Sequence, residues 1–138
     1  MARTSTRGHE GRLHQGLKPL AKATCEAAGY DFTLCEHQSS DVVAVRWRDG
    51  TLERIALEIE CSPRHAVENF RRNISRACEV SICVCPDLRT AGAVVRRLLR
   101  ELETSELERV GILTANALTR LQARESVVAP GADQKPTE

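Results

Sequence analysis

The sequence predicts an α/β domain built around a mixed sheet, and three observations lead to this fold class. Short apolar runs with the two-residue period of strands alternate with longer segments that have the 3.6-residue period of helices. Residues 41–60 contain two such strands around a turn, and residues 80–85 have the continuous apolar character of a central strand. A chain of 138 residues is long enough for one hydrophobic core and too short for two domains.

Residues 41–60 are the most informative segment and predict a β-hairpin. Three apolar residues alternate with other residues in each half of the segment, which is the pattern of a strand with one buried face. Asp49 and Gly50 lie between the halves, and these residue types tolerate the positive φ that a tight turn requires. Strands are therefore expected at about 41–47 and 52–60.

Three carboxylates fall at one end of this hairpin. Asp41 opens the first strand and Glu58 and Glu60 close the second, so pairing around the turn sets Asp41 roughly opposite the two glutamates. Clustered carboxylates repel one another where the dielectric constant is low, which costs stability unless a cation neutralises them. The pattern indicates a divalent metal site. A solvated strand surface is the alternative explanation of two glutamates at i and i+2.

The first part of the chain predicts a disordered start and a helix. Residues 1–8 have the composition of a disordered segment, and residues 9–28 predict a helix that stops at Gly29. Pro19 either kinks this helix or lies in the first turn of a shorter helix that begins near Leu17.

A second helix is expected after the hairpin, with Ser62 as its N-cap and Pro63 at its first position. Pro86 and Asp87 end the strand over 80–85 and start a third helix. The other expected elements are strands over 30–36 and 109–114, helices over 88–103 and 115–123, and a disordered tail over 124–138, so that the single domain spans 9–123.

Composition narrows the function. Charged residues make up 28% of the chain and balance to a net charge of +1, so the chain is not a polyelectrolyte. Aromatic residues make up only 3%, too few for the stacking platforms that bind single-stranded nucleic acid. The first residues have no apolar core of a secretion signal, and no apolar run is long enough to span a bilayer, so a cytoplasmic location without membrane contact is expected.

The six cysteines are expected to be free thiols in a reducing compartment. Cys83 and Cys85 form a C-x-C pattern, and Cys35 and His37 form a C-x-H pattern. Neither pattern has the C-x2-C spacing of a structural zinc site. Because Cys83 and Cys85 would share one face of a strand, they are interpreted as small core residues.

The order of elements, αβββαβ followed by αβ, resembles the PD-(D/E)XK nuclease superfamily, which has the restriction-endonuclease-like fold. The matching residues are Ser40-Asp41 for the first motif and Glu58-Ile59-Glu60 for the second. The resemblance implies an αβββαβ core with a central mixed sheet flanked by helices. It also implies a metal-dependent endonuclease, a hydrolase of DNA phosphodiester bonds.

Residues 55–87 are also similar to a restriction-endonuclease-like module that occurs alone or attached to proteins of mobile elements. In that module a helix that carries histidine or asparagine follows the acidic strand, and the next strand ends in Pro-Asp. His65, Asn69 and Asn73 stand in those places. The two asparagines are expected to face solvent or to contact the active-site loop.

The resemblance also implies roles for the candidate residues. Asp41, Glu58 and the carbonyl of Ile59 would hold Mg²⁺ or Mn²⁺, which polarises the phosphate and lowers the pKa of a bound water. Glu60 stands where the family has a lysine, and it would act as general base or as a further ligand. The three lysines of the chain (Lys18, Lys22 and Lys135) lie outside this strand. The auxiliary candidates are His65, as an alternative base, and Asn69.

Arginines outnumber acidic residues between 64 and 100, which fits a face that contacts phosphates, with Arg64, Arg71 and Arg72 as the candidates. DNA is therefore the expected partner, and a homodimer is expected because a small nuclease often needs a second copy to cut both strands. Two alternatives stay open. One is a catalytically inactive module of the same fold that binds DNA or protein, since the lysine is missing. The other is a small α/β interaction protein, such as an accessory factor of a mobile element.

Overall fold

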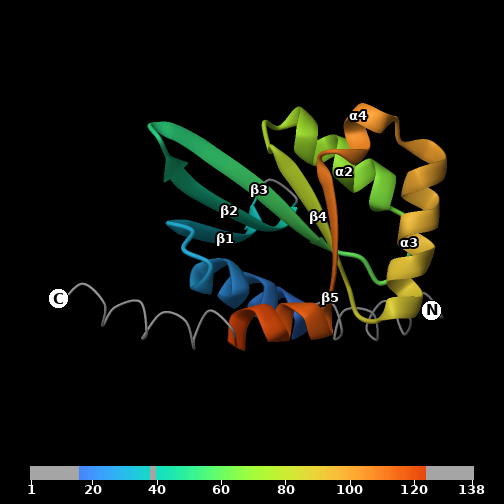
Figure 1. The fold of residues 1–138 in the computed structure, drawn as a ribbon, viewed down its shortest axis with the longest axis horizontal. Coiled ribbons are helices and arrows are strands. Elements are labelled where there is room, and N and C mark those ends of the chain that lie inside the picture. The colour runs from blue at the N-terminus through green and yellow to red at the C-terminus, as the bar shows by residue number, and fades with distance from the viewer. Residues whose placement is uncertain (1–15, 38–39, 124–138) are drawn as a thin grey trace, which may run out of the picture.

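A five-stranded mixed sheet forms the centre of the computed structural model, which describes residues 16–37 and 40–123. Strands β1, β2 and β3 form an antiparallel meander, and β4 and β5 continue the sheet parallel to β3 (Figure 1). This arrangement confirms the predicted α/β class with a mixed sheet. The strands lie in the order β1 (Phe32–His37), β2 (Ser40–Arg48), β3 (Thr51–Ile59), β4 (Val80–Cys85) and β5 (Val110–Thr114).

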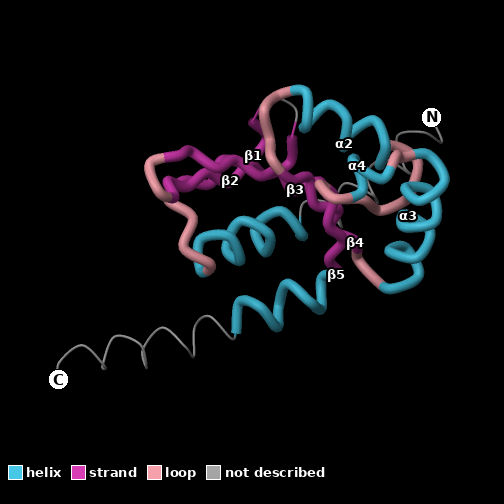
Figure 2. Tube along the Cα trace, turned by 45° about the horizontal axis from the view of Figure 1, so that its top comes forward, coloured by secondary structure: helices cyan, strands magenta, loops and turns pink. Residues whose placement is uncertain are grey.

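Helices cover both faces of the sheet (Figure 2). Helix α2 (Ala66–Ser75) connects β3 to β4, and α3 (Leu88–Glu101) connects β4 to β5, with the single turn α4 (Thr104–Leu107) ahead of β5. The helix over 16–27 and the helix over 115–123 pack against the opposite face. Parallel strands require crossover connections of this kind, so α2 and α3 follow from the pairing of β3, β4 and β5.

Each pair of helices buries its own apolar core. Helix 16–27 contributes Leu17 and Ala21 to the first core, which packs on Leu57 and Val84 of the sheet. The second core joins α2 and α3 to the other face of β4 through Cys83 and Cys85, which are both fully buried. The interpretation of these two cysteines as core residues is therefore confirmed. All six cysteines are free.

The hairpin follows its predicted turn chemistry. Asp49 and Gly50 both have positive φ, at 53° and 77°, which matches the right-handed twist of the flanking strands. The register pairs Val42 with Leu57, so the next positions outward are Asp41 and Glu58. The strands begin and end within one residue of the predicted bounds.

The prediction that Ser62 caps α2 is wrong. The helix begins at Ala66, and the N-cap residue is His65, whose side chain makes no capping hydrogen bond. The Ser62 hydroxyl instead accepts a hydrogen bond from the amide of Arg64 at 3.4 Å. Serine can satisfy a nearby amide in a local turn as readily as at a helix start, so Ser62 and Pro63 form a turn ahead of the helix.

The predicted stop at Gly29 is confirmed. Gly29 has a φ of 93°, and the amide of Tyr30 donates to the carbonyl of Cys25 at 3.2 Å, as in the glycine-ended closure of many helices. Pro19 lies inside helix 16–27. Both alternatives for Pro19 stand, because the expected helical residues before 16 lie outside the described part, as do the expected disordered segments 1–8 and 124–138. Within the described ranges no helix has the length and apolar character to cross a bilayer.

Candidate functional site

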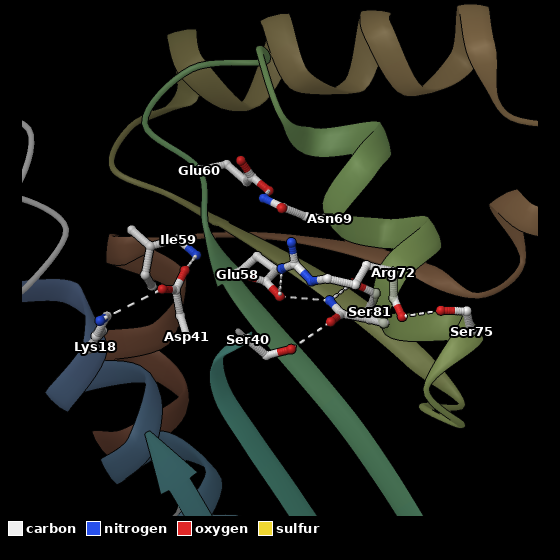
Figure 3. A network of polar contacts seen from close by, with 11 residues as sticks. Lys18, Ser40, Asp41, Glu58, Ile59, Glu60, Asn69, Arg72, Ser75 and Ser81 are labelled. Atoms are coloured by element: carbon white, nitrogen blue, oxygen red, sulfur yellow. Dashed lines mark hydrogen bonds and ion pairs between the residues drawn. The ribbon is translucent and has the colours of Figure 1, made fainter. Parts of the chain in front are cut away.

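The three predicted carboxylates lie at the end of the sheet where β2 begins and β3 ends (Figure 3). Glu58 and Glu60 point toward α2, whereas Asp41 turns toward helix 16–27. The side chains therefore share one end of the sheet, but each is held by different partners. Those partners decide what the site can do.

Glu58 is almost completely buried, at 2% exposure, and α2 supplies its partners. Its Oε2 atom accepts hydrogen bonds from the Asn73 amide at 2.8 Å and from the Arg72 guanidinium at 3.2 Å. The Asn73 amide also donates to the Ser81 hydroxyl at 2.9 Å, and its oxygen accepts from the Ser40 hydroxyl at 2.6 Å. Asn73 therefore joins β2, β3 and β4 through one polar network under α2.

The proton affinity of Glu58 reflects this environment. Burial raises the pKa of Glu58 most, and the hydrogen bond from Asn73 lowers it. The negative charge of Asp41 raises the pKa of Glu58 and the guanidinium of Arg72 lowers it. The Asp41 carboxylate is therefore close enough to destabilise the negative charge of Glu58.

Glu60 is also buried, at 4% exposure, and its Oε2 atom accepts a hydrogen bond from the Asn69 amide at 2.8 Å. Burial raises the pKa of Glu60 to about 7, and the nearby charges of Glu58 and Asp41 act in the same direction. The Asn69 hydrogen bond opposes this shift. Glu60 is thus a buried carboxylate that lies close to two others.

Asp41 has partners on β3 and on helix 16–27. Its Oδ2 atom accepts a hydrogen bond from the amide of Ile59 at 2.7 Å, which fixes the carboxylate against β3. Its Oδ1 atom lies 3.8 Å from the Nζ atom of Lys18, and both side chains are mostly buried. Lys18 thus lies beside one of the carboxylates, although β3 itself contains no lysine.

The sequence patterns did not identify Lys18 as a site residue, because the packing of a helix across a sheet determines its position. The only sequence signal is its place beside Leu17, one of the apolar residues that helix 16–27 buries. Asn73 was also misjudged. The sequence predicts that Asn73 faces solvent or the active-site loop, but it is fully buried, and its amide is hydrogen-bonded to Glu58, Ser81 and Ser40.

The remaining candidates lie on the surface or are engaged elsewhere. The imidazole of His65 is 60% exposed and its Nδ1 atom lies 3.9 Å from the carboxylate of Glu68, also on the surface. Arg71 donates to Glu106 at 3.1 Å, and Arg72 binds Glu58. Arg64 is exposed. Arg71 and Arg72 thus form hydrogen bonds with acidic groups of the chain itself.

The carboxylates of the site are candidate ligands of a metal ion. In the described part of the chain, no group of three or more histidine, cysteine, aspartate or glutamate side chains is arranged to hold a metal. Mg²⁺, however, often binds one or two carboxylates and takes its other oxygens from water and phosphate. Asp41, Glu58 and the carbonyl of Ile59 supply such oxygens, and the repulsion between the two carboxylates is what a divalent cation would remove. The oxygen ligands of the site therefore fit a Mg²⁺ ion whose remaining ligands come from water and from the phosphate of a substrate.

Comparisons with protein-family models, with curated proteins and with solved structures found no significant match. Because a fold alone does not determine function, the chemistry of the site carries the evidence on function.

Proposed function

We propose that this chain is a metal-dependent nuclease that hydrolyses DNA phosphodiester bonds. The observation that carries the proposal is the burial of Glu58 and Glu60, with Asp41 beside them, at one end of the sheet. Burial and the negative charges of Glu58 and Asp41 raise the pKa of Glu60, which costs stability, and an apolar residue would fill this position more favourably. Such a cost is typical of functional sites.

The order of the elements supports the same proposal. An antiparallel meander of three strands, a crossover helix and a parallel fourth strand agree with the αβββαβ core of the restriction-endonuclease-like fold. Asp41 opens the second strand and Glu58 lies near the end of the third, where the PD-(D/E)XK motifs occur.

Each residue of the site has a proposed role. Asp41, Glu58 and the carbonyl of Ile59 would hold Mg²⁺ or Mn²⁺, which would supply the positive charge that polarises the phosphate. Glu60, whose carboxylate is fixed by Asn69, accepts the proton of the attacking water. The Ile59 amide fixes the orientation of Asp41.

The family motif carries a lysine on the third strand, at the position of Glu60 in this chain. Lys18 provides the missing positive charge from helix 16–27. Its ammonium group lies beside Asp41, on the side of the site opposite Arg72. A fixed positive charge at this place stabilises the negative charge that develops on the phosphate oxygens during hydrolysis.

The test is incubation of the purified full chain with supercoiled, linear and branched DNA in the presence of Mg²⁺ or Mn²⁺. Glu58→Gln should reduce cleavage about 100-fold or more, since it removes a charged ligand of nearly the same shape. Glu68→Gln is the matched control, because Glu68 lies on α2 but is largely exposed. Equal cleavage by wild type and Glu58→Gln would contradict the proposed site.

One specific observation favours a second function, a catalytically inactive module that binds DNA or a protein. The Arg72 guanidinium and the Asn73 amide already donate hydrogen bonds to the buried Glu58 carboxylate. Glu58 can therefore stabilise the fold without a bound metal. This alternative predicts that no DNA substrate is cleaved and that Mg²⁺ and Mn²⁺ leave the stability of the chain unchanged.

A further inference from the structure

An apolar surface extends over one face of the β1–β2–β3 meander. Strand pairing sets Phe32 beside Val45, Leu34 beside Val43, and Trp47 beside Leu52, all on the same face of the sheet. Phe32 and Trp47 are 61% and 62% exposed, and Leu34 and Leu52 are exposed as well. We call this surface the apolar meander face and define it by Phe32, Leu34, Val45, Trp47 and Leu52.

The described helices leave this face open. Helix 16–27 packs on the other face of the meander, where the Thr33 hydroxyl donates to Glu26 at 2.9 Å. Helices α2 and α3 pack on β4 and β5, and the β2–β3 turn extends beyond them (Figure 1). The strands of the meander are therefore covered on both faces near the carboxylates and on one face near the turn.

The border of this face is the edge strand of the sheet. β1 pairs with β2 on one side only in the described part of the chain. Natural edge strands usually carry lysine, proline or a bulge that prevents pairing with another chain. β1 has the sequence FTLCEH, without lysine or proline, and it exposes Phe32 and Leu34.

The size of the face matches part of a dimer interface. An aromatic side chain buries about 150–250 Å² in an interface, so Phe32 and Trp47, at 61% and 62% exposure, present roughly 250 Å² to water, and Leu34 and Leu52 add to this area. A stable interface buries about 800 Å² on each partner, with an apolar centre and a polar rim. The apolar meander face would supply that centre, and the turn and the β1 edge would supply the rim.

The low number of charged residues on this face favours a second copy of the chain over a nucleic acid or a highly charged protein as its partner. Among the positions that pair with the five residues of this face, Arg54 is the one ionisable residue, and its guanidinium donates to the carbonyl of Arg76 at 3.4 Å. Glu58 lies on the same face of β3, at the far end from the turn. A two-fold interface sets a surface against its own copy, so it tolerates apolar residues but not a patch of like charges. A nucleic acid or a highly charged protein would require the opposite composition.

We propose that the apolar meander face is a homodimer interface and that a second copy of this chain covers it across a two-fold axis. The face lies toward the turn of the hairpin, whereas Asp41 and Glu58 lie at its other end, so both candidate sites remain accessible in the dimer. This inference does not depend on the proposed nuclease activity.

The first test is the mass of the full chain in solution, measured by light scattering and sedimentation across a wide range of concentration. The wild-type chain should be a dimer, and Phe32→Ser with Trp47→Ser should be a monomer. Leu99→Ser is the matched control, because Leu99 is 62% exposed, like Trp47, but lies on α3. A wild-type chain that is monomeric at every concentration overturns the inference, as does dissociation by Leu99→Ser alone.

The second test uses the fluorescence of Trp47, the only tryptophan of the chain. Its indole should become less accessible to acrylamide as the protein concentration rises, because the second copy covers it. Phe32→Ser keeps the tryptophan and should weaken the dimer at least ~10-fold, which is the loss typical of an anchor residue. An unchanged far-ultraviolet circular dichroism spectrum shows that this variant is folded. Quenching that is independent of concentration in the wild type overturns the inference.

Discussion

The Nζ atom of Lys18 lies 3.8 Å from the Oδ1 atom of Asp41, so helix 16–27 brings a lysine to the carboxylate that opens β2. Positive groups thus reach the carboxylates from both faces of the sheet, since Arg72 of α2 binds Glu58 on the other side. The expected lysine is absent from β3, where Glu60 follows the strand. An ammonium group is nevertheless present at the site.

Lys18→Met is expected to reduce DNA cleavage about 100-fold, because it removes a positive charge beside the proposed metal ligands. The free energy of unfolding should change by only about 1 kcal/mol, since the charges are 3.8 Å apart and methionine keeps the apolar stem of the mostly buried lysine. Lys22→Met is the control, because Lys22 pairs with Glu26 on the same helix. Nuclease assays and urea titrations of both variants check the prediction. Equal losses of cleavage in the two variants would contradict it.

Asn73→Ala is expected to lower the free energy of unfolding by about 3 kcal/mol. It removes the hydrogen bonds to Glu58, Ser81 and Ser40 together and leaves buried polar groups without those partners. Ser75→Ala should change stability by about 0.5 kcal/mol or less, because its hydroxyl is on the surface of the same helix. Urea unfolding measures both. A loss below about 1 kcal/mol for Asn73→Ala would mean that the network is not important for stability.

Stability is expected to fall as the pH rises from 4.5 to about 7. The folded chain holds a proton on Glu60 up to a pKa of about 7, whereas the unfolded chain releases it near 4.5, so the unfolded state binds fewer protons in this range. The loss amounts to about 3 kcal/mol. The raised pKa of Glu58 acts in the same direction. Thermal unfolding in EDTA, compared with Glu60→Gln, measures the effect, and parallel pH curves for the two proteins would contradict the assignment.

Addition of Mn²⁺ is expected to raise the Tm of the wild-type chain. A ligand that binds only the folded state stabilises it by about 2.7 kcal/mol at a concentration 100 times its Kd. Asp41→Asn and Glu58→Gln should each abolish the shift, and the surface variant Glu68→Gln should retain it. This readout needs no DNA and no catalysis. An unchanged Tm in the wild type would favour the inactive module.

Local chemistry explains which features could be predicted from the sequence. The turn at Asp49 and Gly50 was predictable because each residue favours positive φ, and the turn then set the register that brings Asp41 near Glu58. The start of α2 was not predictable, because a serine such as Ser62 can either cap a helix or bind an amide in a local turn, and the sequence pattern is the same in both cases. Lys18 and Asn73 were missed for a different reason. Their contacts depend on how two helices lie across opposite faces of the sheet, which no sequence period encodes.

The hydrogen bonds of Asn73 also affect the register in which the strands pair. A shift of β3 by one residue would turn Glu58 away from α2 and into the apolar core beneath helix 16–27. A carboxylate has no partner in such a core, so the shifted pairing would be far less stable than the native one. The same amide that holds the acidic residue of the site therefore also selects a single alignment of the central strands during folding.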